Sequence, residues 1–227
     1  MQGKLIVFEG GEGGGKSTQL QRLKDWLLAN PFWARRDGPA PSVVTTREPG
    51  GTALGGQLRA LLLNTQDTAE VAIANRSELL LYAADRAQHV AEFIAPHLEQ
   101  GDLVLCDRYT ASTVAYQGYG RGLDLDLIEQ LNQIATVGVT SDLTLWLDLD
   151  VSIGLERVRQ RGETFDRMEI GEIAFHQRIR DGFTAIAAQQ PTMVQIDAAR
   201  NPDTVAAHIQ AVMQEYLQQW YPPLSQN

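Results

Sequence analysis

The sequence is short of cysteine, of long apolar runs and of positive charge, and each shortage argues against a class of protein. Cys106 is the only cysteine among the 227 residues, so no internal disulfide can form, and we expect a reducing compartment, the cytoplasm. No apolar run approaches the roughly 18 residues of a membrane span, so no membrane partner is expected. Nineteen Lys and Arg residues against 28 Asp and Glu give a net charge of −9, which disfavours a nucleic-acid partner, because such proteins usually present a basic face.

What the sequence does contain is an alternation of short apolar runs with amphipathic segments. This alternation predicts an α/β fold, in which helices cover both faces of a five-stranded parallel sheet within a single domain. The predicted strands are Lys4–Glu9, Val43–Thr46, Asp102–Asp107, Leu143–Leu149 and Thr192–Asp197. The predicted helices are Lys16–Leu28, Arg76–Leu98, Leu125–Ala135, Val151–Arg161, Ile170–Gln189 and Thr204–Gln219.

The spacing of apolar residues also predicts which helix faces are buried. Leu20, Leu23 and Leu27 recur on one face of the first helix. In the long helix Arg76–Leu98 we expect the inward residues to be Leu80, Ala84, Ala87 and Ala91. Cys106 lies in an apolar strand and is expected to be a small buried residue rather than a reactive thiol.

The most informative motif follows the first predicted strand. Residues Gly10 to Ser17 read G-G-E-G-G-G-K-S, which fits the phosphate-loop pattern G-x-x-x-x-G-K-[ST] between a strand and a helix. Its glycines let backbone N–H groups converge on one anion at the helix N-terminus, where Lys16 reaches the β- and γ-phosphates of ATP and Ser17 holds Mg²⁺. The predicted ATP-binding residues are Gly10, Gly11, Glu12, Gly13, Gly14, Gly15, Lys16, Ser17 and Thr18.

Polar residues that follow the next strands are expected near this loop, because ligands of parallel sheets bind beyond the carboxyl ends of the strands. Residues 46–52, T-R-E-P-G-G-T, form a shaped loop after the second strand, although such loops more often connect than bind. Asp107 ends the third strand, where an acidic residue orients Mg²⁺ or its waters. Arg108 beside it suits an acceptor phosphate, whereas an Asp-Arg pair that merely closes a strand is the alternative.

Two further arginine patterns suit a nucleotide. Arg157 and Arg161 lie four residues apart on one helical face, with Arg159 between them. A solvated surface helix is one interpretation; a lid that offers cations to a transferring phosphoryl group is the other, which we favour in so acidic a protein. Tyr82 and Arg86 are also four apart and suit a nucleobase, although Tyr82 in the core fits the spacing equally well.

Together these motifs resemble those of the bacterial thymidylate kinases, which move the γ-phosphate of ATP to dTMP, and the resemblance covers nearly the whole chain. It rests on the phosphate loop with Glu12 inside it, on residues Arg47 to Thr52, Tyr82 to Arg86 and Asp107 to Tyr109, and on Ser112 to Gly118. It implies a P-loop nucleoside monophosphate kinase fold over residues 1–227, with a lid near 155–168 and an acceptor-binding region near 47–120. It also implies ATP and dTMP as substrates, Mg²⁺ as cofactor and a homodimer.

The resemblance assigns roles to single residues. Glu12 would contact the 3′-hydroxyl of the deoxyribose, and Tyr116 would crowd the 2′ position. Arg59 and Arg108 would hold the dTMP phosphate, and Tyr82 takes the place of the stacking aromatic. The residues that would address the edge of the base are Arg86, Ser112, Thr113 and Gln117.

The family carries its catalytic arginine either in the phosphate loop or in the lid. The loop of this chain has no arginine, so the chain resembles the lid type. Arg161 is the expected donor, followed by Arg157 and Arg159, and it would act together with Lys16 and Arg108. The metal would be held by Ser17 and Asp107.

Two alternatives stay open from the sequence. One is a kinase for another nucleoside monophosphate, because only the resemblance selects dTMP. The other is a GTP-dependent switch that performs no synthesis, although no Asn-Lys-x-Asp guanine-reading motif follows a strand. The four histidines show no metal-ligand spacing, and we interpret all of them as structural or surface residues.

Overall fold

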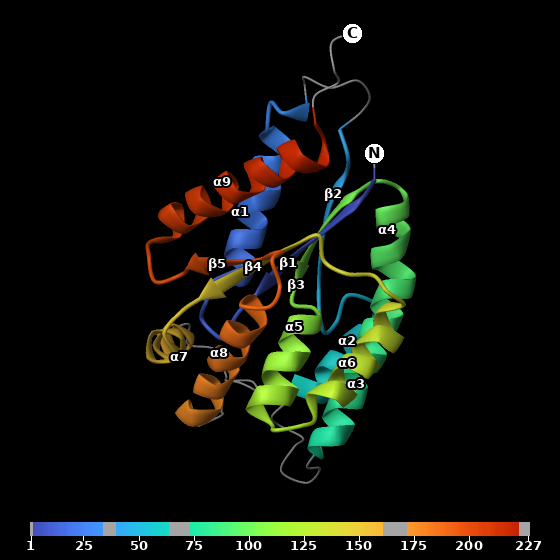
Figure 1. Ribbon diagram of the computed structural model, residues 1–227, viewed down its shortest axis with the longest axis vertical. Coiled ribbons are helices and arrows are strands. Elements are labelled where there is room, and N and C mark those ends of the chain that lie inside the picture. Colours follow the sequence, from blue (N-terminus) through green and yellow to red (C-terminus); the bar gives the residue numbers. More distant parts are fainter. Residues whose placement is uncertain (1, 34–39, 64–72, 161–171, 223–227) are drawn as a thin grey trace.

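The computed structural model describes residues 2–33, 40–63, 73–160 and 172–222, and within them five parallel strands form one sheet (Figure 1). The strands are β1 (Lys4–Glu9), β2 (Val43–Arg47), β3 (Leu103–Asp107), β4 (Leu143–Asp148) and β5 (Met193–Asp197). Their order across the sheet is β2-β3-β1-β4-β5, and every neighbouring pair is parallel. The predicted α/β fold with a five-stranded parallel sheet is therefore confirmed.

Helical segments connect the strands. They are α1 (Lys16–Ala29), α2 (Ala53–Leu63), α3 (Asn75–His89), the π-helical η2 (Val90–Ile94), α4 (Ala95–Glu99), α5 (Thr110–Thr113), the π-helical η3 (Val114–Gly120), α6 (Leu125–Thr136), α7 (Val151–Gln160), α8 (Ile173–Ala187) and α9 (Pro202–Trp220). The predicted long helix is the continuous run α3–η2–α4. The sequence did not predict α2, which contains the poor helix formers Gly55 and Gly56, nor α5–η3.

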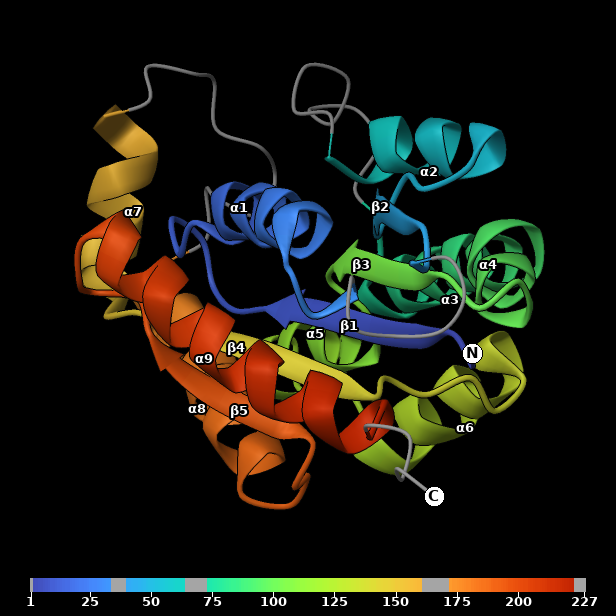
Figure 2. The ribbon, with the colours of Figure 1, turned by 90° about the horizontal axis from the view of Figure 1, so that it is seen from above.

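The sheet is buried on both faces. Helices α1 and α9 lie together on one side of the strands, and the group α3 to α6 lies with α8 on the other (Figures 1 and 2). Along β1, Ile6 and Phe8 pack in the first cluster with Leu23 of α1, whereas Leu5 and Val7 pack in a second cluster on the opposite side. This two-sided burial explains why the central strand reads as a continuous apolar run.

The burial prediction was confirmed for α1 and wrong for α3. Leu20, Leu23 and Leu27 of α1 are buried, as expected. On α3, Leu80 is 50 % exposed and the alanines at 84 and 87 are exposed, as is Ala91 on η2. The α3 side chains that turn inward are instead Glu78, Leu79, Asp85, Arg86 and His89. A buried polar face is tolerated only where its charges and donors find partners. Those partners come from β2, from the segments that follow β2 and β3, and from α5, η3 and α6.

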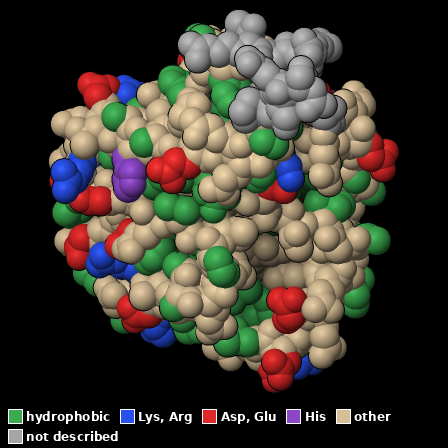
Figure 3. Space-filling view, turned by 45° about the horizontal axis from the view of Figure 1, so that its top comes forward, with side chains coloured by type: hydrophobic (Ala, Val, Ile, Leu, Met, Phe, Trp, Pro, Cys, Tyr) green, Lys and Arg blue, Asp and Glu red, His purple; other side chains and the backbone are tan. Residues whose placement is uncertain are grey.

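Surface properties agree with the composition. On the face drawn in Figure 3, acidic and basic side chains are interspersed and form no large patch of one sign. In the described ranges, no helix combines the length and the apolar character needed to cross a bilayer.

Cys106 is fully buried in β3, as predicted, and its thiol donates to the carbonyl of Arg108.

The loop that follows β1 is pressed against the first turn of α7. A Cβ atom at Gly13 would lie 2.2 Å from the carbonyl oxygen of Gly154, and one at Gly154 would lie 2.4 Å from the carbonyl oxygen of Glu12. Since real side chains do not approach backbone so closely, only glycine at both positions allows this contact. The start of α7 is thereby held directly over the glycine-rich loop.

We expect Gly154→Ala to destabilise the protein by about 1–3 kcal/mol, because the added methyl group must displace backbone. The matched control is Gly56→Ala in α2, where an added Cβ meets nothing within 4 Å; it should stabilise the protein by about 0.5–1 kcal/mol through helix propensity. Urea denaturation of the three proteins measures both effects. Equal stability of Gly154→Ala and its parent would show that the contact between the loop and α7 accommodates the methyl group without loss of folding free energy.

Candidate active site

The glycine-rich loop wraps around the amine of Lys16. Gly10, Gly13 and Gly15 have φ angles of 140°, 69° and 81°, which non-glycine residues rarely adopt. Lys16 Nζ donates to the carbonyl oxygens of Gly10 at 3.1 Å and of Gly11 at 2.8 Å. Burial, followed by the nearby Arg108, lowers the pKa of Lys16. The loop therefore combines the N-terminus of α1 with a buried amine, an arrangement suited to phosphate.

Ser17 and Asp107 meet at the mouth of this loop. The Ser17 hydroxyl donates to Asp107 Oδ2 at 2.8 Å, and Asp107 Oδ1 is buried with no hydrogen bond to any described residue. The described ranges contain no group of three or more His, Cys, Asp or Glu residues arranged for a metal. A divalent cation here would thus combine these two oxygen groups with water and ligand phosphates, which is how Mg²⁺ is usually held.

Arg108 lies beside the loop in an unusual backbone conformation. Its φ angle is 71°, and its N–H donates to the carbonyl of Phe8 at 2.9 Å. The guanidinium donates to the carbonyl of Gly10 at 3.0 Å and to Glu12 Oε1 at 2.8 Å, and it lies over the Tyr116 ring. A left-handed arginine costs roughly 1 kcal/mol or more, and such residues cluster at functional sites.

Glu12 is the anionic counterpart of Arg108. Its Oε1 also accepts the Tyr116 hydroxyl at 2.6 Å. Burial alone would raise the pKa of Glu12, but Arg108, Lys16 and the Tyr116 hydroxyl outweigh it and lower that pKa to about 2. Burial also raises the pKa of Tyr116, so its hydroxyl stays protonated and donates. Glu12 is consequently a fixed carboxylate at neutral pH.

Glu9, at the end of β1, is a site residue that the sequence analysis missed. It is fully buried, and Oε1 accepts the backbone N–H groups of Tyr109 at 2.9 Å and Ser112 at 3.1 Å. The Ser112 hydroxyl donates to Glu9 Oε2 at 2.5 Å and accepts from Arg108 at 3.2 Å. Burial raises the pKa of Glu9. The sequence signal that could have identified Glu9 is its place as an acidic residue at the end of an apolar strand, a place that Asp107 shares.

A pocket of about 510 Å³ is lined by all of these side chains except Glu9, which lies behind Ser112. The predicted site residues that line it are Glu12, Gly13, Gly14, Gly15, Lys16, Ser17, Thr18, Arg59, Tyr82, Arg86, Asp107, Arg108, Ser112, Thr113, Tyr116, Gln117 and Arg157. Gly10 and Gly11 do not line it, but their carbonyl oxygens accept hydrogen bonds from Lys16. Arg161 lies outside the described residues. The phosphate loop and the residues predicted to bind the acceptor thus share one cavity.

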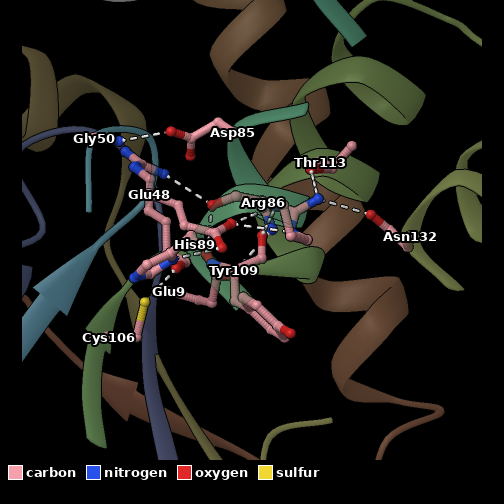
Figure 4. Close-up of polar contacts among 12 residues, drawn as sticks. Glu9, Glu48, Gly50, Asp85, Arg86, His89, Cys106, Tyr109, Thr113 and Asn132 are labelled. Atoms are coloured by element: carbon pink, nitrogen blue, oxygen red, sulfur yellow. Dashed lines mark hydrogen bonds and ion pairs between the residues drawn. The ribbon is translucent and has the colours of Figure 1, made fainter. Parts of the chain in front are cut away.

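Arg86 is buried at the floor of this pocket, with 2 % of its side chain exposed (Figure 4). Its Nε donates to Glu48 Oε2 at 2.9 Å, and Nη2 lies 2.8 Å from the same oxygen and donates to the Tyr109 carbonyl. Nη1 donates to Thr113 Oγ1 at 2.9 Å and to Asn132 Oδ1 at 2.8 Å. Of the five N–H groups that arginine carries, four donate hydrogen bonds to protein acceptors, and Nη2 is also ion-paired with Glu48.

Glu48 connects this arginine to a buried histidine, and both residues were missed from the sequence as site components. Glu48 Oε1 lies 3.0 Å from His89 Nδ1, and His89 Nε2 lies 2.6 Å from Thr46 Oγ1. Asp85 Oδ1 accepts the N–H of Gly50 at 3.0 Å, and burial, followed by the charge of Glu48, raises the pKa of Asp85. The interpretation of His89 as a structural residue is consistent with these contacts. The peptide bond between Glu48 and Pro49 is cis.

The arginines around the pocket differ in where they point. Arg59 donates to the carbonyl of Pro49 at 3.0 Å. Arg157 donates to the carbonyl of Ala198 at 3.1 Å and approaches that of Gly13 at 3.4 Å, so it lies against the phosphate loop. Arg159 is 63 % exposed, pairs with Glu156 at 3.6 Å and does not line the pocket. The structure therefore brings Arg157, but not Arg159, to the site.

Comparisons with known proteins agree with this geometry. The family model described as thymidylate kinase matches residues 8–209. The thymidylate kinase of Cyanothece sp. is 60 % identical over 234 residues, covering 99 % of each chain, and that of Acaryochloris marina is 56 % identical over 232 residues, covering 98 % of this chain and 100 % of the other. The crystal structure of the Ehrlichia chaffeensis thymidylate kinase superposes with a TM-score of 0.70 at 33 % identity, over 94 % of this chain and 100 % of that one. From its phosphate loop to α9, this chain belongs to the thymidylate kinase family.

Proposed function

We propose that this site transfers the γ-phosphate of ATP to dTMP, giving dTDP and ADP, with the residue roles that follow. The observation that carries the proposal is the single pocket lined both by the phosphate loop and by Tyr82, Arg108 and Gln117. Donor and acceptor bound in one cavity can react in line, so that no covalent enzyme intermediate is needed. Because the acceptor phosphate is already anionic at neutral pH, the protein's task is to position the substrates and to stabilise charge.

On the donor side, the loop and Lys16 hold the β- and γ-phosphates. The amine now donates to two carbonyl groups of the loop, from which it can turn toward a phosphate oxygen. Ser17 and Asp107 would hold Mg²⁺, and the buried, unpartnered Asp107 Oδ1 supports that role. When bound, the ion supplies positive charge to the β- and γ-phosphates.

On the acceptor side, Arg108 and Arg59 hold the dTMP phosphate. Glu12, an anion fixed by Arg108 and Tyr116, accepts the 3′-hydroxyl of the sugar. The Tyr116 ring, held by its bond to Glu12, stands where a 2′-hydroxyl would have to fit. Ser112, which is bonded to Glu9 and Arg108, acts on this phosphate side by orienting Arg108, besides any contact with the base.

The base lies between Tyr82 and the polar groups of α3 and of the α5–η3 segment. Tyr82 is half-buried at the pocket wall, where an aromatic ring can stack on a pyrimidine. Arg86, Thr113 and Gln117 address its edge. Arg86 lies in the pocket floor, and both N–H groups of its Nη1 already donate to Thr113 and Asn132, so a base that approaches Nη1 would share these donors.

The catalytic cation comes from the lid, near 155–168, and the acceptor-binding region spans about 47–120 of the single domain 1–227. Arg161 is the proposed donor to the transferring phosphoryl group. Arg157, which lies against Gly13, would support the phosphate loop and the same charge. The exposed position of Arg159 makes it the third candidate.

The protein works as a homodimer, and the outer face of α3 supports this proposal. Leu80 and the alanines at 84, 87 and 91 form an exposed apolar row along α3 and η2. Spacings of three and four residues place them on one helical face. A second copy of the chain would remove this row from water, whereas the row has no evident role in a monomer.

The reaction is tested by measuring ADP release from Mg-ATP with dTMP, dUMP, dCMP, CMP and AMP. We expect dTMP to give the highest kcat/KM. Turnover of AMP or CMP without turnover of dTMP would identify a kinase for another monophosphate. GTP hydrolysis stimulated by a partner protein, without any transfer to dTMP, would identify the switch.

Replacement of Arg161 by alanine should lower kcat by on the order of a thousandfold, because one arginine stabilises the charge of the transition state. Its effect on dTMP affinity, measured by titration calorimetry, should be small. Arg22→Ala is the matched control, and its kcat should stay close to that of the parent, because Arg22 pairs with Asp203 and does not line the pocket. Equal turnover of Arg161→Ala and the parent would reject this residue as the donor.

Leu80→Glu should convert the dimer to a monomer, because it places a charge in the apolar row of α3. Leu28→Glu is the control, since Leu28 is an equally accessible leucine, 61 % exposed, on α1. Sedimentation equilibrium measures the mass of each protein. A parent that sediments as a monomer, or a dimeric Leu80→Glu variant, contradicts the proposed interface.

A further inference from the structure

One side chain in the acceptor pocket is held by a carboxylate that does not line the pocket. Gln117 of η3 lines the pocket and is 2 % exposed, and its Nε2 donates to Glu78 Oε1 at 2.9 Å. Glu78 is fully buried on α3 and forms an ion pair with Arg121, whose Nε and Nη2 each lie 3.4 Å from a carboxylate oxygen. Glu78 therefore stands behind Gln117, on the side away from the ligand.

The chemistry of this pair determines which way the amide faces. An ionised carboxylate only accepts hydrogen bonds, so it must receive the NH₂ group of the Gln117 amide. The guanidinium of Arg121 is the cationic partner of this carboxylate. The amide oxygen is thereby turned away from Glu78, and it makes no hydrogen bond within the ranges that the structure describes. Gln117 presents an acceptor, rather than a donor, to the pocket.

An acceptor at this position distinguishes between pyrimidines. Thymine and uracil carry a hydrogen on ring atom N3 and can donate it to an amide oxygen, whereas N3 of cytosine is an unprotonated acceptor. Two acceptors that face each other in a buried site cannot pair, and each then lacks a hydrogen-bond partner. Sites built around one hydrogen bond reject analogues that cannot complete it.

We propose that Glu78 is a specificity-determining positioning residue, which fixes the amide of Gln117 so that the site accepts thymine or uracil and rejects cytosine. The inference rests on the proposed function and deepens it, because it assigns base selection to a residue outside the pocket. Glu78 touches neither substrate and acts through Gln117. Arg86 supplies donors only, so it cannot provide the acceptor that this selection requires.

The test uses Glu78→Gln, which keeps the shape of the side chain but can offer an NH₂ group. In the parent, Glu78 Oε1 receives both Gln117 and Arg121. In the variant this position can hold an NH₂ group, and the amide of Gln117 can then turn and present its own NH₂ group to the pocket. We expect kcat/KM for dCMP relative to dTMP to rise by at least about tenfold. The ratio of dUMP to dTMP should not change, because both bases have the same N3–H.

Three companion proteins separate this role from a structural one. Gln117→Ala removes the group through which Glu78 acts, so adding Glu78→Gln to it should leave the dCMP to dTMP ratio unchanged. Arg121→Lys keeps a positive charge beside Glu78 and the bond to Gln117, and it should retain the selectivity of the parent. Thermal denaturation of each variant, together with calorimetric titration of dTMP and dCMP, measures folding and binding apart from turnover.

The outcomes are distinct. If the parent phosphorylates dTMP while Glu78→Gln keeps the parental dCMP to dTMP ratio, Glu78 does not set the base preference, and the proposed function stands. The same conclusion follows if the Glu78→Gln effect persists in the Gln117→Ala background, or if dUMP and dCMP change together. A folded parent that neither binds nor phosphorylates dTMP refutes the proposed function itself.

Discussion

The buried guanidinium of Arg86 is the interaction on which the acceptor half of the molecule depends. It joins the loop after β2 through Glu48, the turn after β3 through the Tyr109 carbonyl, α5 through Thr113 and α6 through Asn132. Removal of one partner of a buried ion pair typically costs about 3–5 kcal/mol, because the other charge is left uncompensated. The segments that meet at this end of the pocket are therefore fixed to one another through a single side chain of α3.

Around the phosphate loop, too, buried charges are held in place by ion pairs and hydrogen bonds. Lys16 and Arg108 concentrate positive charge in a chain whose net charge is −9, and local acids hold that charge in place. Glu12 pairs with Arg108, and Asp107 binds Ser17 beside the loop. A small anionic substrate responds to this local arrangement rather than to the total charge of the protein. An acidic protein can thus bind two nucleotides without a broad basic surface.

What could be predicted from the sequence is what depends on local pattern. The parallel sheet and the phosphate loop follow from apolar runs and from glycine spacing, and both are present with nearly the predicted bounds. The buried face of α3 could not be predicted in this way, because an apolar row containing Leu80 looks like a core face while Arg86 does not. Burial of such a charge is decided by partners more than 20 residues away along the chain. Sequence periodicity contains no information about those partners.

The partners that periodicity cannot identify include three buried acids, Glu9, Glu48 and Glu78. Each is almost fully buried, and each binds a residue that lines the pocket: Glu9 holds Ser112, Glu48 holds Arg86 and Glu78 holds Gln117. Because a carboxylate only accepts hydrogen bonds, it fixes which atoms its partner turns toward the ligand. A neutral amide of the same shape would fill the same space without imposing that choice. The orientation of Ser112, Arg86 and Gln117 therefore depends on buried acids, of which Glu9 and Glu78 do not line the pocket.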